Sequence, residues 1–141
     1  MTTELIELLR GGNHSLVVAC GNEVRTFDGR GVSDLLRLLE EKSALLPGAS
    51  VADKVVGKAA AALMALGKVR EVYAEVISQP AFDLLTANGI QASYGALVPH
   101  IINRAGTGLC PLETRCMDCA PPSDCLVRIK EFVAEMKSKA K

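Results

Sequence analysis

Hydrophobic positions along the chain change between helical and strand spacing, and these changes mark the expected elements. Apolar residues in the range 3–10 recur at helical spacing and predict a short helix that ends at Gly11–Gly12. Residues 14–20 have the pattern of a strand and residues 23–28 that of a returning strand, on either side of Gly21–Asn22, which is typical of a β-hairpin. After Ser33, which is suited to cap a helix, leucines at helical spacing predict a second helix that ends at Pro47–Gly48: Leu35, Leu36, Leu38, Leu39, Leu45 and Leu46.

The next segment predicts one long helix, from Ser50 to Gly67. Ser50 and Asp53 have the spacing of a capping box. The apolar residues that follow share one helical face: Val51, Val55, Val56, Ala59, Leu63 and Leu66. Within this helix, Gly57 and a run of four alanines at 59–62 leave little side-chain bulk. Such a surface either packs tightly on a sheet or lets a ligand approach the backbone.

The second half of the chain alternates strands and helices. Strands are expected at 71–78 and 90–95, a helix with Pro80 in its first turn at 80–87, a short helix at 97–104, and a final helix at 124–137 capped by Ser123. The strand at 71–78 is apolar on both faces, which indicates an interior position. The sequence therefore predicts one α/β domain over residues 1–141. Its mixed sheet would lie in a three-layer α/β/α arrangement, with an N-terminal hairpin joined to parallel βα units.

Composition narrows the classes of partner. The 141 residues include 16 basic and 16 acidic side chains, a formal net charge of zero, whereas nucleic-acid binders usually carry a basic excess. The range 84–103 lacks charged residues but contains Asn88, Pro99 and His100, so it does not resemble a membrane span. We expect a cytoplasmic protein that binds neither nucleic acid nor membranes, and the sequence leaves a homo-oligomer open.

Four cysteines lie close together: Cys110, Cys116, Cys119 and Cys125. A Cys-x-x-Cys pair is suited to zinc or an iron–sulfur cluster, but it also occurs in redox proteins and among unliganded thiols, so these three interpretations stay open. Cys110 follows Gly106–Thr107–Gly108 and precedes Pro111, which would place its thiol at a helix start. A lowered pKa there would make Cys110 a candidate nucleophile.

Two segments, VADKVVGKAAAALMALGKVREVYAEVIS and SYGALVPHIINRAGTGLCPLE, resemble a small uncharacterised prokaryotic family with a cytidine-deaminase-like fold. The resemblance runs to about Glu113 and implies that fold, with Cys116, Cys119 and Cys125 as an addition to the family pattern. Zinc deaminases carry ligand motifs at two helix starts. The matching positions here are Val56–Gly57–Lys58 and Gln79–Pro80–Ala81, which contain no metal ligand pair, so zinc-dependent deamination is not expected.

Without the zinc motifs, the resemblance still implies a helix start at the position of the family's pocket. Helix N-termini and lysines favour phosphate or carboxylate groups, although Lys54 and Lys58 could equally share one solvated helical face. We expect a binding protein for a nucleotide or a phosphorylated metabolite, with a site lined by Asp53, Lys54, Lys58, Asn103, Thr107 and Cys110. Two alternatives remain, a Cys110-dependent enzyme or redox protein and a metal-binding interaction protein that uses the four cysteines.

Overall fold

A computed structural model describes residues 2–12, 14–20, 23–28, 33–41, 46–99, 116 and 122–139. Within these residues the elements in chain order are α1 (Thr2–Gly11), β1 (Leu16–Cys20), β2 (Glu23–Phe27), α2 (Ser33–Glu40), β3 (Ser50–Val56), α3 (Lys58–Leu66), β4 (Glu71–Ser78), α4 (Gln79–Ala87), β5 (Gln91–Val98) and α6 (Pro122–Lys139).

The strands form one five-stranded mixed sheet in the order β2-β1-β3-β4-β5. β1 pairs antiparallel with both β2 and β3, whereas β3, β4 and β5 run parallel. Crossover helices make the parallel pairing possible, because α3 returns the chain from β3 to β4 and α4 returns it from β4 to β5. The predicted hairpin, the mixed sheet and the interior position of residues 71–78 are therefore confirmed.

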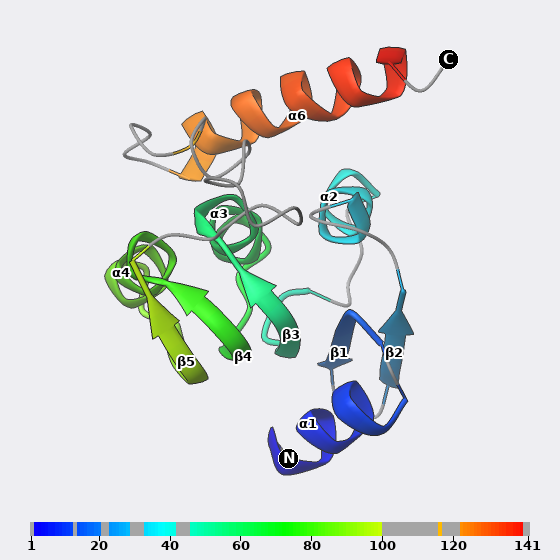
Figure 1. Cartoon of the computed structure of the whole chain (residues 1–141), viewed down its shortest axis with the longest axis vertical. Helices are drawn as coiled ribbons and strands as arrows, with labels where there is room; N and C mark the ends of the chain where they lie inside the picture. Colours follow the sequence, from blue (N-terminus) through cyan, green and yellow to red (C-terminus); the bar gives the residue numbers. More distant parts are fainter. Residues whose placement is uncertain are drawn as a thin grey trace.

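Helices cover the two faces of the sheet unequally. α2, α3 and α4 lie on one face, and α6 lies across α3 on the side away from the strands (Figure 1). α1 packs on the opposite face, against β1 and β3. The larger core thus lies between the sheet and α3, and a smaller one lies beneath α1.

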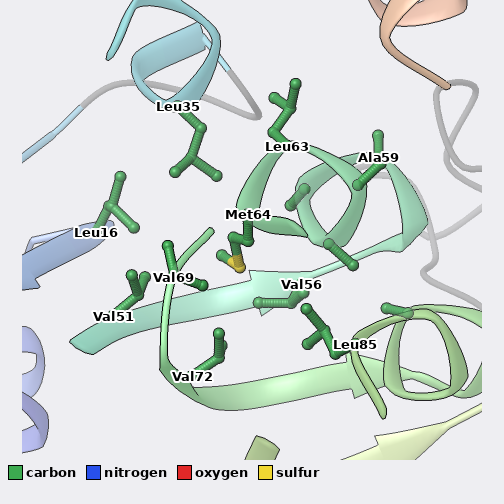
Figure 2. Close-up of a cluster of buried hydrophobic side chains, with 14 of the residues drawn as sticks. Leu16, Leu35, Val51, Val56, Ala59, Leu63, Met64, Val69, Val72 and Leu85 are labelled. Atoms are coloured by element: carbon green, nitrogen blue, oxygen red, sulfur yellow. The ribbon is translucent and has the colours of Figure 1, made fainter. Parts of the chain in front are cut away.

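α3 is the centre of the larger core. All residues from Ala59 to Met64 are buried, and Met64 points toward β3 while Leu35 of α2 enters the same cluster (Figure 2). The four alanines let α3 approach its neighbours closely, because a larger side chain at these positions would push the helix away. Close packing therefore explains the run of small residues.

The expected helix from Ser50 to Gly67 is wrong in its first half. Residues 50–56 form β3, and the helix begins only at Lys58. Val51 and Ala52 are adjacent and both buried, because β3 lies between two strands and is covered on both faces. Such a strand carries no polar/apolar alternation, so its valines could be placed on one face of a helix.

Other boundaries also differ from the expected ones, and three of them affect how residues are interpreted. α2 ends at Glu40, so Leu46 lies beyond it, and residues 42–45 are outside the described residues. Leu97 and Val98 continue β5 instead of starting a helix, and the remainder of that expected helix, residues 100–104, is also outside them. Ser123 lies inside α6 and is not its cap, since the helix begins at Pro122.

Candidate functional site

The start of α3 lies at the carboxyl ends of the parallel strands. β3 ends at Val56, Gly57 adopts an extended conformation with φ −94° and ψ 178°, and Lys58 is the first residue of the helix. Among the described residues, no side chain forms a capping hydrogen bond to this helix, and its first turn contains no acidic residue. The partial positive charge of the helix start is therefore not neutralised by a carboxylate of its own first turn.

The start of α4 differs in its capping. The Ser78 hydroxyl accepts a hydrogen bond from the Ala81 N–H at 3.3 Å, and Pro80 follows in the first turn, where the missing N–H costs nothing. Ser78 is fully buried. The two helix starts that match the deaminase motif positions are thus both at the carboxyl edge, but the start of α4 is already capped by the chain itself.

Asp53 of β3 has the largest pKa shift among the titratable groups of the described residues. Burial raises the pKa of its carboxyl to about 7, and the Asp34 carboxylate adds to this rise. The backbone N–H groups of Val55 and Lys54 hydrogen-bond to the carboxyl and oppose the rise. Asp34 lies in the first turn of α2 and also accepts a hydrogen bond from Arg37 at 3.2 Å. A carboxyl with this pKa can either donate or accept a proton near neutral pH.

The two lysines of the expected site do not share a helical face. Lys54 lies on β3, within the sheet and not on a helix. Lys58 lies at the start of α3. Of the expected ligand-binding residues, Asp53, Lys54 and Lys58 are described, whereas Asn103, Thr107 and Cys110 lie outside the described residues.

His14 and Asp28 form a side-chain contact that sequence analysis did not identify. The His14 Nδ1 and Asp28 Oδ1 atoms are 2.7 Å apart. His14 precedes β1, and Asp28 directly follows β2. Both residues lie at the end of the sheet where β3 terminates, because Leu16 pairs with Phe27 and with Asp53. The hairpin register was the available signal, since the pairing of Leu16 with Phe27 places the flanking residues His14 and Asp28 near each other.

The cysteines are only partly described. Cys116 and Cys125 are fully buried in the larger core, while Cys110 and Cys119 lie outside the described residues. In the described part of the chain, no group of three or more His, Cys, Asp or Glu side chains could hold a metal ion. A metal site on four cysteines and a nucleophilic Cys110 both stay predictions.

No described helix is long and apolar enough to cross a membrane.

Comparison with known proteins identifies the family. A family model described as "TM1506: Domain of unknown function (DUF1893)" matches residues 4–133. This chain belongs to the DUF1893 family. A solved DUF1893 protein from Thermotoga maritima is 25% identical and superposes with a TM-score of 0.83, covering 92% of this chain and 88% of the other. None of the curated proteins matches the chain.

The DUF1893 match extends further than the sequence resemblance indicated. It ends at residue 133 and not near Glu113, so it spans the four cysteines and most of α6. The limit of the resemblance at about Glu113 is therefore wrong, whereas the interpretation of Cys116, Cys119 and Cys125 as an addition to the family pattern stays a prediction. The DUF1893 match also contains every described element of the carboxyl edge, from His14 to the start of α4.

Proposed function

We propose that this protein binds a small anionic molecule, a nucleotide or a phosphorylated metabolite, at the start of α3. The observation that carries the proposal is the composition of that start: Gly57 provides no side-chain cap, Lys58 provides a positive charge, and no acidic residue follows in the first turn. Backbone N–H groups at a helix N-terminus together with a lysine favour a phosphate or carboxylate group.

The position of this helix start in the sheet supports the same proposal. In open α/β sheets, ligands bind outside the carboxyl ends of the parallel strands. β3, β4 and β5 all end at this edge, and α3 is the helix that follows β3. Lys58 is therefore located where this class of fold usually contacts its ligand.

Asp53 is compatible with an anion because of its raised pKa. At neutral pH a carboxyl with a pKa of about 7 carries a proton roughly half of the time. In its neutral form it does not repel an anion, and its hydroxyl can donate a hydrogen bond to a ligand oxygen. Asp53 would then contact the ligand beside the group held by α3.

The order of the elements supports a deaminase-like fold for this binding protein. The helix, the hairpin and the βα units that carry the resemblance are present, with β3 added before α3. The residues at the two motif positions, Val56–Gly57–Lys58 and Gln79–Pro80–Ala81, include no zinc ligand. We therefore propose binding without zinc-dependent deamination.

The test is a thermal-shift titration with inorganic phosphate, AMP and ribose 5-phosphate. Replacing Lys58 by Ala removes a charge-assisted contact of about 1.5–3 kcal/mol, so the affinity should fall roughly ten- to a hundredfold. The variant should remain folded, because a lysine beside the positive end of a helix does not stabilise it. Lys54→Ala is the matched control, since Lys54 lies on β3 and not at the helix start, so its loss should change the affinity little.

A second variant tests the helix start itself. Gly57→Asp supplies a capping carboxylate in an extended conformation that any residue adopts, so the variant should be as stable as the wild type or more so, while anion binding is lost. The proposal is wrong if none of the three anions stabilises the wild type, or if Lys58→Ala and Lys54→Ala respond alike.

A further inference from the structure

The two edges of the sheet differ in how they are protected against pairing with another strand. β2 is five residues long, and its exposed Glu23 and Arg25 lie within 4.0 Å of each other. A short edge strand with charged side chains resists association with a further strand, because pairing would remove water from those charges. β2 therefore has the features of an edge that stays solvated.

β5, at the opposite edge, has none of these features. Its eight residues, Gln91–Val98, include no charged residue and no proline. It keeps one register with β4 from Gln91 to Val98, so no bulge turns the strand away. Within the described residues, β4 is its only neighbour in the sheet. Long, regular and uncharged edge strands readily pair with a further strand.

The side chains of β5 are exposed along most of the strand. Tyr94 is 42% exposed and Leu97 38% exposed, although the Tyr94 ring also contacts Phe82 of α4, with ring centroids 5.7 Å apart. Gly95 has no side chain and is itself exposed. The middle of the strand therefore combines an exposed aromatic ring with accessible backbone.

We propose that β5 pairs antiparallel with β5 of a second copy of this chain, so that one sheet continues through both copies. The chemistry favours a copy of itself as the partner. The strand carries no charge that would face a like charge, and the whole chain has a formal net charge of zero, so two copies do not repel each other at long range.

The geometry of such a dimer is determined by the pairing. Two identical antiparallel strands in one sheet are related by a two-fold axis perpendicular to it, which keeps the helices of both copies on the same side. α4 packs on β5, so α4 would face its counterpart across the axis. The exposed parts of Tyr94 and Leu97 would then be covered at the interface.

The experiment introduces opposite charges at Ser93, in the middle of the strand. Ser93 is exposed and alternates with Tyr94, so its side chain lies on the face opposite α4 and a longer one does not disturb the core. Sedimentation velocity should show a dimer for the wild type. Ser93→Lys and Ser93→Glu should each weaken dimerisation about tenfold, because like charges meet near the axis.

Mixing the two variants distinguishes self-pairing from other causes. Equal amounts of Ser93→Lys and Ser93→Glu should form a heterodimer, since the charges are then opposite. Thr26→Lys on the exposed part of β2 is the control and should leave the dimer intact. The proposal is overturned if the wild type is monomeric at about 100 μM, if mixing restores nothing, or if Thr26→Lys dissociates the dimer instead. A monomeric wild type would leave β5 available to a strand from another protein.

Discussion

Asp53 shows how one carboxyl group links the sheet to the pH response of the whole protein. The pKa of its carboxyl is about 7 in the folded protein, compared with an ordinary value of 3.8, and burial is the main cause of the rise. Folding therefore favours the protonated form between these two values. The resulting contribution to stability is fully present below pH 4 and is lost as the pH rises toward 7.

Replacing Asp53 by Asn should remove this pH dependence, because an amide resembles the neutral carboxyl and still accepts the backbone hydrogen bonds. The free energy of unfolding of the wild type, relative to that of the variant, should fall by about 2 kcal/mol from pH 5 to pH 7. Urea denaturation at each pH measures this difference. Asp83→Asn, on the exposed face of α4, is the control, and parallel profiles for wild type and Asp53→Asn would contradict the prediction.

At the scale of elements, sequence pattern was informative where one face of an element is buried and the other is solvated. The hairpin turn at 21–22 and Pro80 at the start of α4 are local signals, and both elements formed as expected. β3 could not be identified in this way, because α3 covers one of its faces and α1 the other. Gly57 was the one local sign of a boundary, and it is the residue before α3.

The candidate site was predictable only in part for the same reason. Lys58 was recognised as a lysine near a helix start, but Lys54 was assigned to the same helix and lies on a strand. The contact between His14 and Asp28 depends on how the two strands of the hairpin pair, so the hairpin register indicates it and the residues next to either one in sequence do not. Pairing across the sheet is therefore the information that the sequence did not contain locally.

The close packing of α3 leads to a prediction for its alanines. Ala62 has no exposed surface, so Ala62→Leu should destabilise the protein by about 1–3 kcal/mol through overpacking, whatever the role of the helix start. Ala87→Leu, on the exposed surface of α4, is the matched control and should have little effect. Chemical denaturation of both variants measures the contrast. Equal stabilities would show that the run of alanines is not explained by packing.

On the scale of the whole molecule, the face of the sheet opposite α3 depends on α1. Leu5 and Leu9 of α1 form a small core with Val17, Ala19, Ala52 and Tyr73. Arg10 adds an ion pair with Glu75 and a hydrogen bond to the Tyr73 hydroxyl at 3.1 Å. Both interactions attach α1 to the sheet, but the apolar contacts are buried and the Arg10 side chain is 61% exposed.

Burial predicts which of these contacts holds α1 in place. Leu9→Ala should cost about 2–4 kcal/mol, because Leu9 is fully buried and its loss leaves a cavity beneath the sheet. Arg10→Gln should cost much less, since water and salt screen an exposed ion pair, and added salt should reduce even this small effect. Urea denaturation gives both values, and hydrogen exchange on β1 and β3 shows whether α1 detaches locally. If Arg10→Gln destabilised the protein as strongly as Leu9→Ala, charge and not apolar burial would hold this face together.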